Sequence, residues 1–436
     1  MKRRQFIVGS ALAGAAWLPI ARSWGAGSAG GTDLPARSLS GTDITLAKND
    51  ITDLARNLQG ELLLPDSARY EQARRVWNGS IDKRPALIAA CVGASDVMRA
   101  VNFARDHKLL TAVRAGGHST SGKSTCDGGI MIDLSPMRGV RVDPKTKTAY
   151  LEPGTLLGQL DRESAAFGLA TTAGTVSNTG AAGLTLGGGF GRLCSRFGLA
   201  CDNLKGADVI GADGRFVHTS ESENPDLLWG LRGGGGNFGV VTSLEYSLHE
   251  MDPLVIGGIV SWPFKYARDV LDFYAQFAPA KPDMLCTDLI LRAAPGSDPN
   301  LSIVVCWSGD PAAGERVMEP LRKLARTAQG TIGPAPYVRL QSMFDGGFPD
   351  GRKYYQKSGL LSVLNEPLAD TLVDLFGTPR AQPLTMQLQG MGGAAGRVAP
   401  SATAFVHRDA LWDMAIITQW ENAAESDSHI AAMRTV

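Results

Sequence analysis

A histidine that follows two glycines is the first group whose type and spacing suggest chemistry. The segment Arg114-Ala115-Gly116-Gly117-His118-Ser119 comes after a strand-like apolar stretch and leads into a polar loop. Consecutive glycines expose backbone N–H groups, which can form an anion-binding nest for a pyrophosphate. A neutral imidazole is a nucleophile at neutral pH, so His118 could also bond to an electrophilic ligand. The alternative is that His118 only caps the loop through a hydrogen bond.

Two further glycine-rich segments, 180–191 and 233–239, could line a nucleotide site. The second contains a G-x-G-x-x-G pattern at Gly234, Gly236 and Gly239. A Rossmann site needs a strand before the glycines and a helix after them. Here the preceding residues look helical and the following ones look like a strand. The reversed order disfavours the Rossmann interpretation, although a nucleotide could still lie against these glycines.

The elements that must position these residues mix helices with hairpins. Residues 86–92 form an apolar run typical of a short buried strand, and Ser95 is expected to cap the helix that follows. Residues 110–113 and 130–134 are also strand-like. Turn signals predict two hairpins, one around residues 143–148 and one at Asp213-Gly214. This mixture favours an α+β fold.

A second domain is predicted to begin after Asp252-Pro253. Helices are expected at 265–278 and 314–328, and strands at 286–293, 301–307 and 384–388. Alternation along the last strand puts Thr385, Gln387 and Gln389 on one face. That face could contact a ligand, or it could be an ordinary solvated face of a sheet. Residues 29–59, with little periodicity, are interpreted as a loose leader.

Residues 1–28 are predicted to be an export signal. Arg3-Arg4 precede an apolar run, residues 6–20, that is too short to span a bilayer comfortably. Paired arginines indicate the twin-arginine route. The expected location is therefore periplasmic or extracellular, with no stable membrane insertion after signal removal. An uncleaved anchor is the alternative.

Composition excludes some other classes of function. The chain has 43 basic and 43 acidic residues, so no basic footprint for nucleic acid is evident. No cysteine lies in a C-x-x-C motif or at zinc-ligand spacing, and no metal site is expected. Buried free thiols are predicted at all six cysteines: Cys91, Cys126, Cys194, Cys201, Cys286 and Cys306.

Taken together, these segments resemble the vanillyl-alcohol-oxidase (PCMH) type of FAD domain, in its berberine-bridge-enzyme-like branch. The resemblance covers about residues 60–250 and keeps the family's order of motifs. The matching stretches are 76–78 with Pro85, 114–119, 174–191, 197–203 and 228–242. It implies an α+β protein with a two-part FAD-binding domain at 60–252. A substrate domain at 253–436 would then have an antiparallel sheet covered by helices.

The resemblance also implies how the cofactor is held. In this family the histidine matching His118 is bonded to the 8α-methyl carbon of FAD. Some members add a cysteine link, but the matching position here is Val176, so a single covalent link is predicted. The residues expected to bind FAD are Arg114, Ala115, Gly116, Gly117, His118, Ser119, Gly174, Thr175, Thr179, Gly180, Gly183, Leu184, Gly187, Gly188, Gly189, Gly239, Val240 and Val241.

On the substrate side, the resemblance implies an enzyme that oxidises a small alcohol, amine or sugar hydroxyl. Hydride would pass to the flavin and O2 would take the electrons, giving H2O2. The candidate proton acceptors are Tyr355 and Lys357, Gln389 is a further candidate catalytic residue, and His407 is interpreted as structural. A dehydrogenase with another acceptor and an inactive secreted flavin-binding protein are the alternatives. The family's usual C-terminal return segment is expected to be missing, because the chain stops within an apparent helix.

Overall fold

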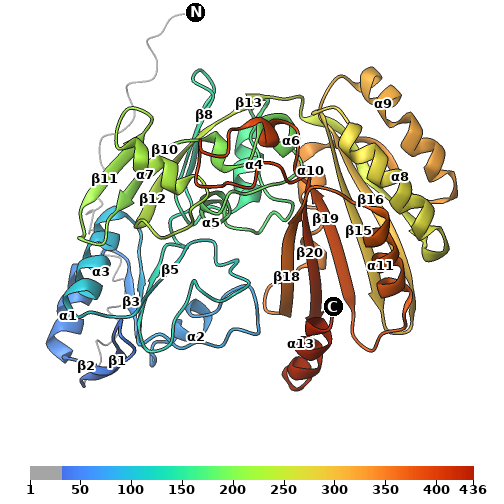
Figure 1. The fold of residues 1–436 in the computed structure, drawn as a ribbon. Helices are drawn as coiled ribbons and strands as arrows, with labels where there is room; N and C mark the ends of the chain where they lie inside the picture. The colour runs from blue at the N-terminus through green and yellow to red at the C-terminus, as the bar shows by residue number, and fades with distance from the viewer. Residues whose placement is uncertain (1–31) are drawn as a thin grey trace, which may run out of the picture.

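The computed structural model describes residues 32–436, and its first half contains two sheets (Figure 1). The smaller sheet has the order β3-β4-β6-β5, in which β4, β6 and β5 are parallel and β3 is antiparallel. Its strands are β3 (Glu61–Leu63), β4 (Leu87–Ala90), β5 (Thr111–Arg114) and β6 (Ile130–Asp133). Helices α2 (Tyr70–Ala73) and α3 (Ala94–Asp106) accompany it. Helix α3 begins one residue before Ser95, after Gly93, and has no side-chain cap, so the predicted Ser95 cap is wrong.

The interpretation of residues 29–59 as a loose leader is wrong for the part that the structure describes. This part forms β1 (Leu34–Arg37), β2 (Asp43–Leu46) and α1 (Lys48–Asn57). Ile51, Leu54 and Leu58 pack into the core beneath α3. Their spacing places them on one helical face, so burial of that face holds the segment against the first sheet.

The second sheet has five antiparallel strands in the order β11-β10-β12-β8-β7. The two predicted hairpins are confirmed as β7–β8 and β10–β11. The strands are β7 (Val140–Asp143), β8 (Thr148–Leu151), β10 (Leu204–Ile210), β11 (Phe216–Ser220) and β12 (Val240–Ser247). The helices are α4 (Leu157–Ala165), α5 (Ala181–Leu186), α6 (Cys194–Phe197) and α7 (Pro225–Leu231). A short pair, β9 (Leu169–Ala170) with β13 (His249–Glu250), leads out of this half.

The second half is built on one antiparallel sheet of seven strands, ordered β17-β14-β16-β15-β19-β20-β18. The strands are β14 (Leu254–Pro263), β15 (Leu285–Ala294), β16 (Ser297–Trp307), β17 (Gln329–Pro336), β18 (Lys353–Leu361), β19 (Leu384–Gly390) and β20 (Trp412–Trp420). The helices are α8 (Ala267–Ala280), α9 (Pro311–Leu324), α10 (Tyr337–Gln341), α11 (Glu366–Gly377), α12 (Ala394–Arg397) and α13 (Ser426–Arg434). The predicted α+β fold is confirmed.

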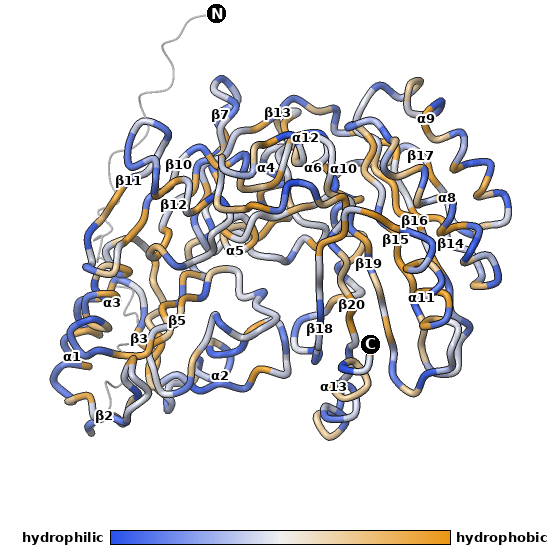
Figure 2. Tube along the Cα trace, viewed as in Figure 1, coloured by the Kyte–Doolittle hydropathy of each residue, from blue (hydrophilic) through white to orange (hydrophobic). Residues whose placement is uncertain are grey.

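The two faces of this sheet have different neighbours. Helices α8, α9 and α11 cover the outer face, where Leu289 of β15 and Leu388 of β19 join the largest apolar core, and α13 packs against this core at the end of β18 and β20 (Figure 1). Figure 2 shows hydrophobic colour along β15 and β16 and mixed colour on α9, as expected for a helix with one buried side. The inner face, which carries Ile290, Gln389, Ala415 and Tyr354, is turned toward the first half.

The predicted export signal, the cysteines and the expected absence of a metal site are features of the chain as a whole. The expected signal at residues 1–28 lies outside the described residues. In the described part, no helix combines the length and apolar character needed to cross a membrane. All six cysteines are buried free thiols, as predicted. No cluster of side chains suited to a metal ion occurs within residues 32–436.

Candidate FAD site

The segment that follows β5 places His118 at the contact between the two halves. Its imidazole stacks on Trp77, with ring centroids 4.2 Å apart, and Trp77 stacks on Tyr354 of β18 at 3.9 Å. The His118 Nε2 atom is buried and has no hydrogen-bond partner in the described structure. Burial also lowers the pKa of His118, which favours the neutral, nucleophilic imidazole. The side chain therefore has an unused nitrogen in the form that can bond to carbon.

Glycines bring the backbone of the His118 segment against the start of α5. A Cβ on Gly116 would lie 2.3 Å from the Gly180 Cα, and one on Gly180 would lie 2.7 Å from the Gly116 Cα. No side chain fits at either position. Gly117 has φ of +74°, a conformation that glycine adopts readily. The two segments thus form one wall with exposed backbone groups.

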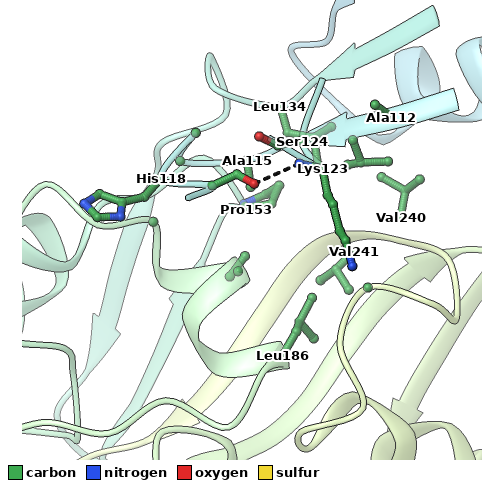
Figure 3. Close-up of a pocket in the computed structure, with 18 of the residues that line it drawn as sticks. Ala112, Ala115, His118, Lys123, Ser124, Leu134, Pro153, Leu186, Val240 and Val241 are labelled. Atoms are coloured by element: carbon green, nitrogen blue, oxygen red, sulfur yellow. Dashed lines mark hydrogen bonds between the residues drawn. The ribbon is translucent and has the colours of Figure 1, made fainter. Parts of the chain in front are cut away.

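A pocket of about 670 Å³ runs along this wall. Its volume lies within the range usual for ligand and cofactor sites, roughly 300–1,000 Å³. Figure 3 shows His118 at one end and the side chain of Lys123 extended toward Val241. Lys123 carries the positive charge among the lining residues, since His118 is kept neutral. A long site with a glycine wall and one cation suits a dinucleotide with a pyrophosphate.

Most of the expected cofactor-binding residues meet at this pocket. Twelve of them line it: Ala115, Gly116, Gly117, His118, Ser119, Thr179, Gly180, Gly183, Leu184, Gly239, Val240 and Val241. The glycine-rich segment 233–239 contributes although a strand follows it, because Gly236 and Gly239 lie just before β12 and line the pocket. A nucleotide site at these glycines therefore does not need Rossmann order.

Six of the expected residues lie off the pocket: Arg114, Gly174, Thr175, Gly187, Gly188 and Gly189. The Arg114 guanidinium instead donates to the Ala73 carbonyl and lies 3.7 Å from Asp133, so it supports the loop from behind. A Cβ on Gly188 would meet the Phe405 ring, which places this glycine at a packing contact. The predicted set therefore contains both residues that line the pocket and residues that support its walls from behind.

Other lining residues were not predicted. They include Ser124, Leu134, Pro153, Asn237 and Lys123. Lys123 stands five residues after His118 in a polar loop, and its backbone N–H donates to the Ser119 hydroxyl at 3.1 Å. Lys123 could have been predicted, because it is a cationic residue close to the glycines expected to bind a pyrophosphate. The apolar lining residues carry no such signal in the sequence.

The inner face of the seven-stranded sheet meets the pocket wall at residues 174–180. The Gln389 side chain donates to the Thr175 hydroxyl at 2.9 Å, and Val176 packs with Ile290 and Val304. The alternation expected along this strand is confirmed, because Met386 and Leu388 lie in the outer core. Gln389 is therefore placed beside the wall that carries Thr179 and Gly180.

The structure does not bring Tyr355 and Lys357 to the pocket. Tyr355 packs against the outer core, and the Lys357 Nζ atom lies 3.5 Å from the Arg434 carbonyl of α13. Their neighbour Tyr354 faces inward and stacks on Trp77. A shift of one residue along a strand reverses the face, and alternation alone did not fix it here. His407 is exposed on a loop and does not line the pocket.

A buried histidine nitrogen without a partner, a wall built from glycines and one lysine in the same pocket fit an FAD-binding protein. A family model described as an FAD binding domain matches residues 85–220. (R)-6-hydroxynicotine oxidase of Paenarthrobacter nicotinovorans is 32% identical over 379 residues, which cover 84% of this chain and 81% of that protein. Chitooligosaccharide oxidase of Gibberella zeae is 28% identical over 368 residues, covering 79% and 73%.

A solved structure supports the same relationship. Crystalline 6-hydroxy-D-nicotine oxidase of Arthrobacter nicotinovorans superposes with a TM-score of 0.78 at 28% identity, covering 87% of this chain and 84% of that one. This chain belongs to the berberine-bridge-enzyme-like family of FAD-linked oxidoreductases. It is an enzyme of that family, and the resemblance found in the sequence is confirmed.

Proposed function

We propose that the protein is an oxidase that holds one FAD covalently through His118 and oxidises a small alcohol, amine or sugar hydroxyl. The buried His118 Nε2 atom without a partner is the observation that carries the proposal. Leaving such an atom unsatisfied costs about 1–3 kcal/mol, which suggests that its partner is the cofactor. Bound FAD supplies the redox chemistry: it accepts a hydride from substrate and returns two electrons to O2, giving H2O2.

The covalent link joins an imidazole nitrogen to the 8α-methyl carbon of the flavin. One hydrogen leaves each partner as the C–N bond forms, and O2 takes up both hydrogens as H2O2. The neutral imidazole that burial favours is the form able to make this bond. Trp77 stacks on the imidazole of His118 and is itself stacked on Tyr354, so the orientation of the imidazole is set before the cofactor arrives.

A single link is proposed because Val176 occupies the position of the second one. Val176 has no nucleophilic atom and packs against Ile290 and Val304 of the sheet. Cys194 and Cys201 are buried elsewhere, and burial raises the pKa of each thiol, to about 11 and about 12. Neither thiol is available as a thiolate at neutral pH.

The proposed substrates are small molecules with a C–H bond next to oxygen or nitrogen. The relatives include an oxidase named for hydroxynicotine and another named for chitooligosaccharides. Such substrates release a hydride from carbon and a proton from the heteroatom. The inner face of the sheet, with Gln389 beside the pocket wall, offers the surface for them.

Export by the twin-arginine route is proposed as well. This route carries folded proteins, so FAD could be attached before the protein crosses the membrane. Replacing Arg3 and Arg4 by lysine should retain the protein inside the cell, as measured by fractionation. Normal export of that variant would contradict the proposal.

The first test is the intact mass of the denatured protein beside His118→Ala. The unmutated protein should carry the mass of one FAD, and the variant should carry none. A circular dichroism spectrum checks that the variant is folded. An adduct that survives in His118→Ala would contradict the assignment of the link to His118.

The second test separates an oxidase from a dehydrogenase. The flavin is reduced without oxygen by a panel containing (R)-6-hydroxynicotine and chitooligosaccharides, and air is then admitted. Rapid return of the oxidised spectrum with one H2O2 per turnover is expected. A flavin that stays reduced in air would identify a dehydrogenase instead.

A further inference from the structure

A carboxylate stands on the inner face of the sheet next to Gln389. Strand β20 places Trp412, Met414 and Ile416 in the outer core, and Ala415 and Ile417 against Trp77 on the inner face. Alternation therefore turns Asp413 inward. Asp413 lies directly opposite Gln389 of β19 on one side and Leu360 of β18 on the other.

Nothing in the described structure neutralises this carboxylate. Asp413 is 9% exposed, and no described side chain or backbone group forms a hydrogen bond or ion pair with it. Its strand neighbours Gln389 and Leu360 are uncharged, and Leu360 packs against the same apolar cluster as Phe190 and Phe405. Burial alone raises the pKa of Asp413 to about 6. Unpaired buried acids are expensive, and acids with perturbed pKa values cluster at functional sites.

The other buried acids near the site already have partners. Asp288, on β15, accepts the Gly390 backbone N–H at 3.0 Å. Asp161, on α4, lies 3.4 Å from the Gln341 amide. Asp413 is thus the buried acid of the inner face with both oxygens free for a ligand.

We propose that Asp413 is the catalytic base, receiving the proton of the substrate O–H or N–H while Gln389 binds the same heteroatom. The inference rests on the proposed oxidase function. As the C–H bond breaks, its hydride passes to FAD; the heteroatom proton passes to the Asp413 carboxylate, and a C=O or C=N bond forms. The proton later leaves Asp413 to solvent, and O2 collects two electrons and two protons as H2O2. Atoms and electrons therefore balance.

The role of Asp413 predicts a specific pH dependence. The ionised carboxylate accepts the proton, so the rate of flavin reduction should rise with pH and level off above about pH 6. Asp413→Asn should lower the limiting rate about 100-fold or more and remove the rise. Asp413→Glu should restore part of the rate, because it returns a carboxylate.

Asp409→Asn is the matched control, since Asp409 is exposed on the same segment. It should keep the wild-type rate and pH profile. If Asp413→Asn changes the rate by less than about threefold and keeps the rise with pH, the proposal is overturned. Equal flavin content in all variants, read from the absorption spectrum, shows that cofactor binding is intact.

A second measurement needs no substrate and separates this proposal from the oxidase proposal. The absorption spectrum of the oxidised holoenzyme is titrated from about pH 4.5 to 8. A spectral change with a midpoint near pH 6 that is absent in Asp413→Asn supports a carboxylate at the flavin face. The same titration in both proteins overturns it. If the substrate panel fails to reduce wild-type flavin, the proposed function fails, and the titration still decides the position of Asp413.

Discussion

At the scale of the residue, Asp413 should destabilise the folded protein whenever it is ionised. Its pKa is about 6 in the fold and about 3.9 in an unfolded chain. Between these values the unfolded chain loses its proton first, so the free energy of unfolding falls as pH rises from about 4 to about 6. The full loss is about 3 kcal/mol at most, because one pK unit corresponds to about 1.4 kcal/mol.

Asp413→Asn should therefore stabilise the protein at neutral pH and leave it unchanged in acid. Chemical unfolding at about pH 4 and pH 7.5 measures this difference. The expected gain is about 1–3 kcal/mol at the higher pH and close to zero at the lower one. Equal effects at both pH values would mean that the charge of Asp413 is not the cause.

At the scale of the element, a buried ion pair holds the loop between α12 and β20 on the first half. The Arg408 guanidinium donates to both Asp202 oxygens, at 2.8 and 2.9 Å, and is 4% exposed. The same loop carries Phe405, whose ring packs at Gly188 and Gly233. The ion pair thus positions an aromatic side chain against two glycine-rich segments.

Arg408→Met should cost about 3–5 kcal/mol, because it leaves the Asp202 carboxylate without its partner. Arg397→Met is the control: its ion pair with Asp283 is largely exposed, and such pairs contribute about 0–1 kcal/mol. Thermal unfolding of the two variants measures the contrast. A similar small loss in both would show that burial does not strengthen the Arg408 contact.

How well the sequence predicts an element depends on where its signal lies. Asp213-Gly214 is a local turn signal, and the hairpin it predicts is present as β10–β11. Strands β1 and β2 have four residues each, too few for alternation to appear, and the helical spacing of Ile51, Leu54 and Leu58 along α1 and its C-cap was not recognised. Tyr354 and Tyr355 are identical in type, so only tertiary packing could assign their faces.

The residues of the FAD site were likewise predictable only where their signal is local. The His118 segment and the glycine wall were found because glycine and histidine carry their chemistry in their residue type. Asp413 was missed because its significance depends on the pairing of β19 with β20, which brings it opposite Gln389. Its lack of a partner is also a property of the folded protein, and no local pattern records it.

At the scale of the whole molecule, residues 77–79 join the two halves. The Asn78 amide donates to the Tyr354 carbonyl at 3.1 Å and accepts the Tyr354 N–H at 3.0 Å, while it also donates to Thr120 at 2.8 Å. Trp77 donates from its indole to the Phe348 carbonyl and stacks on His118. The edge strand β18 is therefore tied to the segment that holds His118.

We expect Asn78→Ala to weaken this connection and to separate the unfolding of the two halves. The variant leaves the buried backbone groups of Tyr354 without partners, at a cost of about 1–3 kcal/mol for each. Calorimetry should show one cooperative transition in the unmutated protein and a lower, broadened or divided transition in the variant. Asn57→Ala is the control, because among the described residues the Asn57 side chain donates hydrogen bonds to Asp53 within its own helix. If Asn78→Ala lowers the midpoint without broadening, Asn78 stabilises the fold but does not couple its halves. In that case the stack of Trp77 on Tyr354 would be enough to hold Trp77 against His118. Flavin attachment in Asn78→Ala should then proceed at the normal rate.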